Sequence, residues 1–268
     1  MQKSLCDLGR VGVAFSGGVD STFVLRVAVD ALGRENVVAF TGASDSVATA
    51  ELDEARRLAE LIGAPHVLVP TREFEDPNYL ANPTNRCYYC KSELYSRIGP
   101  LLAKHGLRAL VTGTNADDLH DHRPGLIAAD EHNIRSPAAE AGLTKADIRA
   151  WSARWGLPTA DKPASPCLSS RVQYGEAITP EKLRMIEHGE RILREIGIRE
   201  CRVRHHNDLA RIEVPPNQIA LLTTPDVRAR LDAEFRRIGY AYVTIDLRGF
   251  RSGSMNEVIA FGRIQPAL

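Results

Sequence analysis

The sequence lacks a long apolar run and lacks an excess of charge of either sign. A membrane span needs about 20 consecutive apolar residues, and no stretch of this chain approaches that length. The start, MQKSLCDLGR, has no apolar core of the kind found in signal peptides. Lys plus Arg and Asp plus Glu number 34 each, so the overall charge does not draw the chain to nucleic acid or to an anionic membrane. We therefore expect a cytoplasmic protein that does not partner a membrane. The balanced charge argues against nucleic acid as a partner, and a local basic patch stays open.

Cysteine is scarce, and its number is odd. The five cysteines are Cys6, Cys87, Cys90, Cys167 and Cys201. An odd number in a chain without an export signal argues against a framework of disulfides and favours thiol or metal chemistry. The remaining composition, with 44% hydrophobic and 25% charged residues, is ordinary for a soluble globular protein and excludes a disordered chain.

The first half of the chain alternates short β-branched runs with helical patterns. This alternation predicts a parallel sheet, and the continuously apolar strands indicate that helices cover both of its faces. We expect ligands to bind beyond the carboxyl ends of the strands. The predicted strands are 11–15, 37–40, 66–69 and 107–113, and the predicted helices are 21–32 and 49–62.

The second half follows a different pattern after a break at 161–171, where Pro163 and Pro166 disfavour a regular element. Thr179 is typical of an N-cap and Pro180 of the first residue of a helix, which continues to about 196. We predict a Rossmann-like α/β domain over residues 1–170 and a small α+β domain over 171–268, which binds substrate or mediates oligomerisation. The further predicted elements are a hairpin of 201–205 and 209–214, a helix 225–238, and strands 242–246 and 258–264.

Six residues between the first strand and the first long helix form a candidate phosphate-binding loop. They are Ser16, Gly17, Gly18, Val19, Asp20 and Ser21. Backbone N–H groups and a helix N-terminus would surround an anion there, and glycine lets the backbone approach phosphate closely. The pattern is neither the Walker loop nor the dinucleotide fingerprint. It resembles the PP-loop of the ATP pyrophosphatases, which include GMP synthetase, NAD synthetase and the tRNA thiolation enzymes. The alternative is a Gly-Gly turn followed by a capped helix.

This resemblance implies that the loop holds the pyrophosphate end of ATP and that Asp20 helps to hold Mg²⁺. The segment 113–118, Gly-Thr-Asn-Ala-Asp-Asp, matches the second conserved loop of the group, at the mouth of the same sheet. Asn115, Asp117 and Asp118 are therefore further candidates for the ATP site. Paired carboxylates suit Mg²⁺, which prefers oxygen ligands and shields the leaving pyrophosphate. The alternative for Asp117 and Asp118 is loop capping.

Three more segments narrow the resemblance: Asn-Arg-Cys-Tyr-Tyr-Cys-Lys at 85–91, Ser-Pro-Cys-Leu-Ser-Ser-Arg at 165–171 and Arg-Ser-Gly-Ser-Met-Asn at 251–256. Together with the PP-loop they resemble, over nearly the whole chain, the LarE family of ATP-dependent sulfur transferases in nickel-pincer nucleotide cofactor biosynthesis. The resemblance implies adenylation of a carboxylate of pyridinium-3,5-biscarboxylic acid mononucleotide. Sulfur then displaces AMP, a good leaving group, and gives a thiocarboxylate. A homo-oligomer and an upstream sulfur donor are expected with this activity.

The family uses two sulfur sources. In one branch a single cysteine, which matches Cys167 here, gives up its own sulfur. In the other, three cysteines hold a [4Fe–4S] cluster that carries an extra sulfide. Cys87 and Cys90 favour the cluster, because a Cys-x-x-Cys pair and one distant thiolate leave one iron without a protein ligand. A structural zinc site would need a fourth ligand that the spacing does not supply. A redox pair at Cys87 and Cys90 with a sacrificial Cys167 stays open, and Cys6 and Cys201 are interpreted as packing residues.

A mononucleotide substrate needs a phosphate site of its own. Arg202 and Arg204 lie two apart on a predicted strand, so their guanidinium groups project from one face and suit a phosphate. Arg171 and Arg251 are expected to converge on the same anion, together with Ser170. The alternative for the strand arginines is a solvated basic face.

Two other functions compete with this interpretation. A tRNA thiolation enzyme would also adenylate its substrate and deliver sulfur, but the balanced charge argues against it because proteins that bind tRNA usually carry a basic stripe. A non-catalytic nucleotide or iron–sulfur binding module is disfavoured by the complete PP-loop and second loop. We expect an enzyme that uses ATP and Mg²⁺, with Cys167, Asp20 and Arg171 as catalytic residues.

Overall fold

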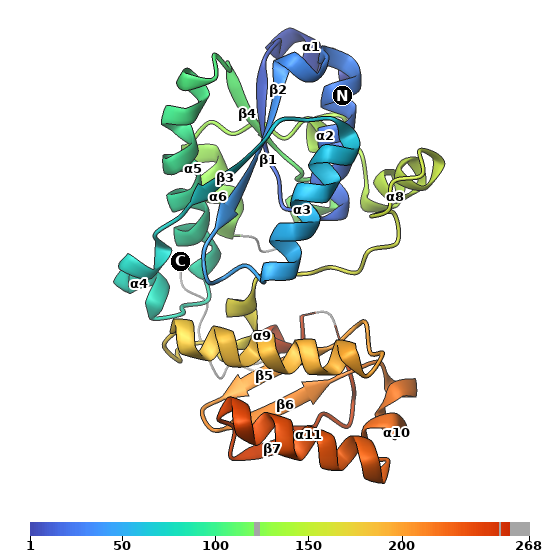
Figure 1. Ribbon diagram of the computed structural model, residues 1–268. Coiled ribbons are helices and arrows are strands. Elements are labelled where there is room, and N and C mark those ends of the chain that lie inside the picture. Colours follow the sequence, from blue (N-terminus) through green and yellow to red (C-terminus); the bar gives the residue numbers. More distant parts are fainter. Residues whose placement is uncertain (121–123, 252, 258–268) are drawn as a thin grey trace. The chain divides into compact units, whose positions relative to one another are not determined.

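The structure is a computed structural model that describes residues 1–120, 124–251 and 253–257 (Figure 1). The chain divides into two compact units. The first comprises Met1–Asp76 and Asn85–Ser165, and the second comprises Pro77–Thr84 and the chain from Pro166 onward. The main segment of the second unit begins at Pro166, close to the predicted domain limit at residue 170. The predicted limit itself stays a prediction. Within the described residues, no helix is long and apolar enough to cross a membrane.

Four parallel strands form the sheet of the first unit, in the order β3-β2-β1-β4. The central strand β1 pairs with β2 on one side and with β4 on the other. All four residues of β1 are buried, as expected for a strand that is covered on both faces. The predicted parallel α/β sheet is confirmed. The bounds are β1 Val11–Ala14, β2 Val37–Ala43, β3 His66–Pro70 and β4 Ala109–Thr112.

Helices cover both faces of this sheet (Figure 1). On one face, α1, α2, α3 and α8 contribute buried side chains such as Leu25 and Ile148 to a core shared with β1 and β2. On the other face, α5 and α6 pack around Phe40 and Ile98. The strand order changes direction between β1 and β4, and sheets of this kind bind ligands at that point. The helix bounds are α1 Gln2–Leu8, α2 Val19–Leu32, α3 Thr49–Ile62, α5 Arg86–Lys104, α6 Pro124–Glu131 and α8 Lys145–Arg154.

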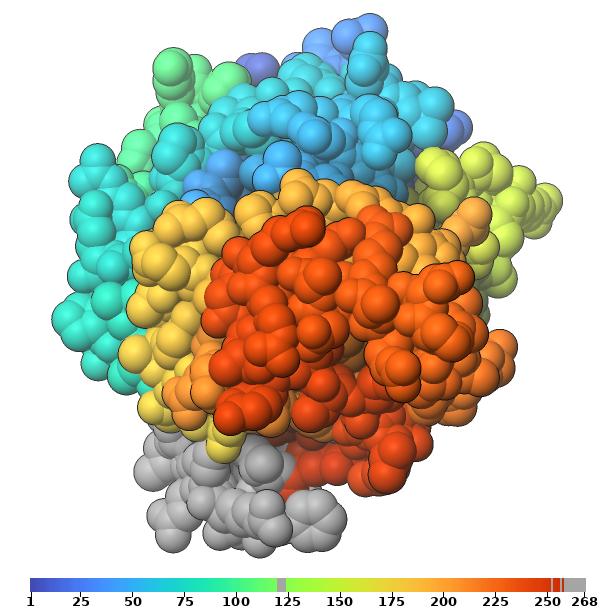
Figure 2. Space-filling model, turned by 60° about the horizontal axis from the view of Figure 1, so that its bottom comes forward, coloured from blue at the N-terminus to red at the C-terminus, as the bar shows by residue number. Residues whose placement is uncertain are grey.

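The second unit contains a three-stranded sheet in the order β5-β6-β7. β5 and β6 are antiparallel, whereas β6 and β7 are parallel. Val203 and Ile212 of the sheet pack with Leu193 of α9 and Phe235 of α11 in one buried core. Figure 2 shows the gold α9 and the red-orange α11 on one surface of this unit. The bounds are α9 Pro180–Glu195, β5 Arg202–His206, β6 Leu209–Glu213, α11 Pro225–Ile238 and β7 Tyr242–Ile245.

Local signals in the second half of the sequence predicted these elements well. Thr179 caps α9 by accepting a hydrogen bond from the Lys182 amide at 3.3 Å, and Pro180 is the first helical residue. The predicted hairpin and the helix 225–238 are confirmed. The predicted strand 258–264 lies outside the described residues. Short helices and 3₁₀ turns complete the structure: α4 Pro77–Leu80, α7 Pro137–Glu140, α10 Ile219–Leu222, Arg34–Asn36, Glu73–Glu75, Asp117–His120, Leu168–Arg171, Pro216–Gln218 and Ser254–Asn256.

Candidate active site

The predicted phosphate loop connects β1 to α2 and is closed by hydrogen bonds between its two serines. The Ser21 hydroxyl accepts from the Ser16 amide at 3.2 Å and lies 3.1 Å from the Ser16 hydroxyl. Gly17 has a φ of 68°, in the left-handed region that favours glycine. A side chain on Gly17 would also approach the Ala55 backbone to 3.3 Å. The loop therefore curls tightly into the N-terminus of a 14-residue helix, which is the arrangement that binds phosphate in other proteins.

The second loop lies directly on the first. A Cβ atom on Gly113 would come within 2.7 Å of the Ser21 amide nitrogen and within 2.9 Å of its Cα. Only glycine fits there without a shift of the backbone. Just beyond it, the Asn115 side-chain amide donates to Asp20 Oδ1 at 3.2 Å. The structure thus brings together the two predicted ATP-binding loops, which are separated by about 95 residues of sequence.

The two carboxylates of the second loop have mainly local partners. The Asn115 side-chain oxygen accepts from the amides of Asp117 and Asp118 at 2.9 and 3.3 Å. Asp118 Oδ2 accepts from the Asn115 amide at 3.1 Å, and Asp117 Oδ2 accepts from the Lys145 amide at 2.8 Å. The contact of Asp118 is that of loop capping, the alternative considered for both residues, whereas Asp117 contacts the start of α8, 28 residues further along the chain. Their role toward a metal stays a prediction.

Two lysines that the sequence analysis missed contact the phosphate loop. The Lys145 ammonium group donates to Asp20 Oδ2. The Lys162 ammonium group donates to the Gly17 carbonyl at 3.2 Å and pairs with Glu51 and Glu54 at 2.8 and 3.1 Å. Neither lysine lies in a motif, and both are more than 100 residues from the loop in sequence. Only the tertiary structure reveals them.

The five cysteines differ in exposure, and none forms a disulfide bond. Cys87 is exposed and Cys90 is partly buried on the first turns of α5. Residues three apart lie on the same side of a helix, so the two thiols are neighbours. Cys167 is partly buried in the second unit. Among the described residues, no group of three or more His, Cys, Asp or Glu side chains is placed to hold a metal ion.

The other two cysteines test the packing interpretation. Cys201 is fully buried, and burial followed by the charge of Glu190 raises the pKa of its thiol to about 12. Such a thiol is inert at neutral pH, so the packing interpretation is confirmed for Cys201. It is wrong for Cys6, which is exposed on α1.

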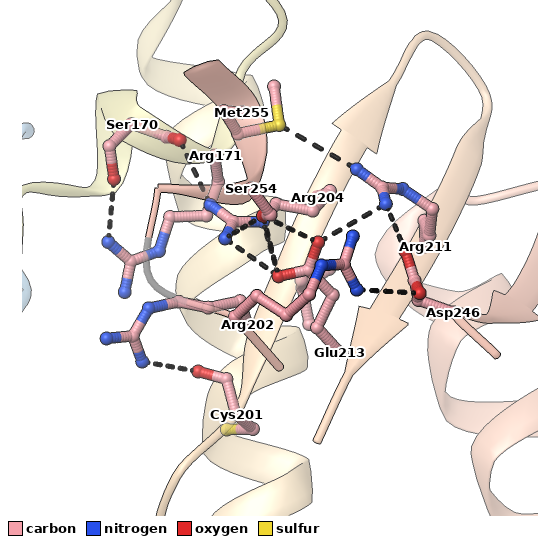
Figure 3. Close-up of polar contacts among 12 residues, drawn as sticks. Ser170, Arg171, Cys201, Arg202, Arg204, Arg211, Glu213, Asp246, Ser254 and Met255 are labelled. Carbon is pink, nitrogen blue, oxygen red and sulfur yellow. Dashed lines mark hydrogen bonds and ion pairs between the residues drawn. The ribbon is translucent and has the colours of Figure 1, made fainter. Parts of the chain in front are cut away.

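Buried arginines gather on the second unit's sheet and on the segment that carries Cys167 (Figure 3). Arg202 and Arg204 project from the face of β5 opposite to Val203, because strand side chains alternate. Arg204 donates through Nε and Nη2 to Glu213 at 3.0 and 2.7 Å, and through Nη2 to the Ser254 hydroxyl at 2.8 Å. Arg204 also donates to the backbone oxygen of Ser170 at 3.2 Å.

Arg171 anchors the segment around Cys167. One guanidinium nitrogen donates to the carbonyls of Pro166 and Cys167 and to the Ser170 hydroxyl, at 2.5, 3.0 and 3.0 Å. The group also makes a two-point contact with Glu190 at 2.8 and 3.2 Å. Burial alone would raise the pKa of the Glu190 carboxyl, but the charge and hydrogen bonds of Arg171 hold it below its ordinary value. The Glu190 carboxyl is therefore ionised beside the Arg171 guanidinium group.

Buried charges of both signs meet in this cluster. Arg171, Arg202 and Arg204 are buried guanidinium groups, and Glu190 and Glu213 are buried carboxylates. Arg202 donates to the Cys201 carbonyl at 2.6 Å and stacks over the Phe250 ring at 5.0 Å. Burial and then the charge of Arg171 lower the pKa of Arg202 to about 10. Guanidinium groups suit phosphate, and the binding of a substrate phosphate by these arginines stays a prediction.

Arg251, the last of the predicted phosphate-binding arginines, is less buried than the other three. Arg251 is partly exposed and pairs with Asp246 at 3.2 Å and with Glu257 at 3.1 Å. Asp246 is shared with Arg211, which also contacts Glu213 at 3.3 Å. Arg251 is therefore linked to the cluster through Asp246 and Arg211. The sequence analysis missed the partners that hold these arginines, because the sequence does not say which polar residues will pair: Glu190, Glu213, Asp246 and Ser254.

Comparisons with known proteins place the chain among nucleotide-dependent enzymes. The asparagine synthase family matches residues 2–152. Over 253 residues, and 94% of both chains, the protein is 48% identical to the uncharacterized protein slr1717 of Synechocystis. It is 41% identical, over 96% of its length and 92% of the relative, to the pyridinium-3,5-bisthiocarboxylic acid mononucleotide synthase of Lactiplantibacillus plantarum. The tRNA-specific 2-thiouridylase MnmA of Thermosynechococcus vestitus is 30% identical over 60% of this chain and 52% of its own.

The contact at Gly113 yields a first prediction. We expect Gly113→Ala to lower ATP affinity at least about tenfold, because the new methyl group pushes the second loop away from the backbone of Ser21. Gly99→Ala is the matched control, since a Cβ there meets nothing within 4 Å. Calorimetric titration with ATP measures the effect. Equal ATP affinities of the two variants would contradict the prediction that both loops contact the nucleotide.

Proposed function

The chain belongs to the LarE family of pyridinium-3,5-bisthiocarboxylic acid mononucleotide synthases, and we propose that it activates a carboxylate of a pyridinium mononucleotide with ATP and then replaces the activated oxygen with sulfur. One observation carries the proposal. The chain contains two separate arrangements for anions, a phosphate loop in the first unit and a buried cationic cluster in the second. A reaction between ATP and a second phosphorylated molecule needs both.

The first step is adenylation. A carboxylate oxygen of the substrate attacks the α-phosphorus of ATP, the bond to the β-phosphate breaks, and pyrophosphate leaves. The amides of the PP-loop and the N-terminus of α2 bind the phosphates and stabilise the charge that develops on pyrophosphate. Ser16, Gly17, Gly18, Val19 and Ser21 form this loop in the proposal, and Asn115 orients Asp20.

Magnesium fits the same loop. Mg²⁺ takes oxygen ligands, and Asp20 and Asp117 present carboxylates beside the loop. Each carboxylate has about four acceptor positions, so the hydrogen bonds to Asn115 and Lys145 leave capacity for a cation. When bound, Mg²⁺ would supply charge compensation for the leaving pyrophosphate.

The second step replaces AMP. Sulfur attacks the activated carboxyl carbon, the bond to the AMP oxygen breaks, and AMP leaves as the thiocarboxylate forms. Arg202 and Arg204, with Ser170 and Arg171, hold the phosphate of the mononucleotide during both steps, while Arg171 keeps the Cys167 segment in place. Arg251 supports this site through Asp246.

We propose that the sulfur comes from a [4Fe–4S] cluster held by Cys87, Cys90 and Cys167. The donor set fits, since three thiolates leave one iron without a protein ligand, and the thiols of Cys87 and Cys90 are neighbours on one side of α5. The cluster, when bound, would supply a transferable sulfide, and an upstream sulfur donor would then replenish it. The alternative is that Cys167 gives up its own sulfur.

The loop assignment is tested with Asp20→Ala. We expect pyrophosphate release in the presence of substrate to fall about 10²- to 10³-fold, because the variant lacks a carboxylate where charge develops. Asp30→Ala is the matched control, since Asp30 lies at the other end of α2 and pairs only with the exposed Arg26 among the contacts described. A coupled assay for pyrophosphate measures both. Normal release from Asp20→Ala would show that the loop does not hold ATP in this way.

The phosphate cluster is tested with Arg202→Met. Methionine keeps an apolar stem over Phe250 and removes a charge that burial and Arg171 disfavour. We expect a folded protein that has lost most of the rise in melting temperature that inorganic phosphate gives the wild type, with ATP affinity unchanged. Arg236→Met, on the exposed face of α11, is the control. If phosphate stabilises Arg202→Met as much as the wild type, the substrate phosphate binds elsewhere.

The sulfur source is tested with Cys87→Ala and Cys90→Ala. After anaerobic purification, both variants should lose iron, sulfide and the brown absorbance, and with them sulfur transfer, while pyrophosphate release continues. Cys6→Ala, an exposed thiol of the same unit, should retain all of these properties. Mass spectrometry of the protein after turnover tests the alternative sulfur source. A chain lighter by the mass of H₂S at Cys167, with Cys87 and Cys90 dispensable, would identify Cys167 as the donor.

A further inference from the structure

The segment Pro77–Thr84 belongs to the second unit, although the residues on both sides of it belong to the first. Its backbone is tied to a later part of the second unit. The Ile178 amide donates to the Leu80 carbonyl at 3.0 Å, and the Gly175 amide donates to the Asn82 carbonyl at 3.0 Å. This stretch, which we call the inserted segment, is therefore an integral part of the second unit.

Asn82 makes the most specific contacts of the inserted segment. It is fully buried and has a φ of 51°, in the left-handed region that few residues other than glycine and asparagine adopt. Its side-chain amide donates to the Val172 carbonyl at 3.3 Å and to the Gln173 carbonyl at 2.8 Å. A side-chain amide has two N–H donors. Asn82 uses them to fix two consecutive peptide groups just after Arg171.

Tyr79 makes a contact on the other side of Arg171. Its hydroxyl lies 2.7 Å from the Ser169 hydroxyl, and both residues are buried. Leaving a buried hydroxyl without a partner is costly, so this pairing favours one arrangement of the two side chains. The inserted segment therefore contacts the chain on both sides of Ser170 and Arg171.

Ser170 and Arg171 are the two residues enclosed by these contacts, and the proposed function assigns both of them to the phosphate of the mononucleotide. Their other neighbour is β5. Arg204 donates to the backbone oxygen of Ser170 at 3.2 Å, and Val172 forms an isolated parallel bridge with His205 (Figure 3). Several groups bind one phosphate well only if their relative positions are fixed before the ligand arrives. The inserted segment and β5 together supply that fixation.

On the basis of the proposed function, we propose that Tyr79 and Asn82 are positioning residues of the substrate phosphate site. They act through Ser170 and Arg171, whose backbone they hold where the side chains meet the arginines of β5. Without either contact the backbone shifts, and the guanidinium groups no longer converge on one phosphate. ATP binding, which the proposed function assigns to the loops of the first unit, does not depend on them.

The role of Asn82 is tested with Asn82→Gly in the full chain. Asn207→Gly is the matched control, since Asn207 also has a positive φ, 53°, but is exposed in the turn between β5 and β6. Glycine adopts both backbone conformations freely, so the variants differ in the side-chain contacts they lose. Inorganic phosphate should raise the melting temperature of Asn207→Gly as it does that of the wild type, whereas Asn82→Gly should lose most of this rise.

The rise is measured for each variant against the same variant without phosphate, so a lower starting melting temperature does not count as a loss. A full rise in Asn82→Gly would overturn the positioning role of Asn82.

The role of Tyr79 is tested with Tyr79→Phe, which keeps the buried ring and removes only the hydroxyl. Pyrophosphate release should show a KM for the mononucleotide that is about fivefold higher, as for one lost hydrogen bond, with the KM for ATP unchanged. Ser169→Ala should give the same rise, and the double variant no more than either single variant, because all three lack the same contact. Tyr242→Phe, at an exposed position of β7, is the control.

An unchanged KM for the mononucleotide in Tyr79→Phe, or an equal rise in the KM for ATP, would overturn the positioning role of Tyr79.

Failure of the phosphate site and failure of the positioning role give different results. If inorganic phosphate does not stabilise the wild type, or stabilises Arg202→Met equally, the phosphate site of the proposed function is refuted, and the positioning role with it. If Arg202→Met loses the rise while Asn82→Gly and Tyr79→Phe behave as the wild type does, the phosphate site stands and only the positioning role fails.

Discussion

The close approach of Gly113 to the backbone of Ser21 determines how the two loops of the first unit meet. β1 and β4 are neighbours in the sheet, so the loops that follow them emerge side by side. They can touch only because Gly113 has no side chain where a Cβ would lie 2.7 Å from the Ser21 amide nitrogen. Close contact of the loops then lets Asn115 reach Asp20 and lets Lys145 and Lys162 approach the PP-loop from segments that follow β4.

The second unit contains a cluster of buried charged side chains. Buried ion pairs are weak evidence for stability, because the cost of removing both charges from water approaches the gain from their attraction. Here Arg171 pairs with Glu190 and Arg204 with Glu213, and the buried Arg202 lies in the same cluster. Departures from the rule that charges stay in water are typical of functional sites.

Burial also separates the cysteines into reactive and inert thiols. Cys201 lies in the apolar core of the second unit, and burial raises the pKa of its thiol to about 12, so it is excluded from chemistry. Cys87, Cys90 and Cys167 are more exposed than Cys201. Arg171 links Cys167 to the cluster of buried charges, since its guanidinium group contacts both Glu190 and the carbonyl of Cys167. One side chain therefore contacts both the Cys167 segment and the buried charges.

The sequence by itself determined the parallel sheet, the capped helix at Thr179, the hairpin and the two loops at the ends of β1 and β4. These features depend on residues close together in the chain, through periodicity, capping and turn chemistry. Tertiary structure alone decided that Lys145 contacts Asp20, that Arg171 pairs with Glu190 and Arg204 with Glu213, and that Pro77–Thr84 joins the second unit. Lys145 and Asp20 are 125 residues apart, and even on the neighbouring strands β5 and β6 a charged residue carries no local signal of which opposite charge it will meet. That choice is made by folding, because a charge leaves water only where a partner is already in place.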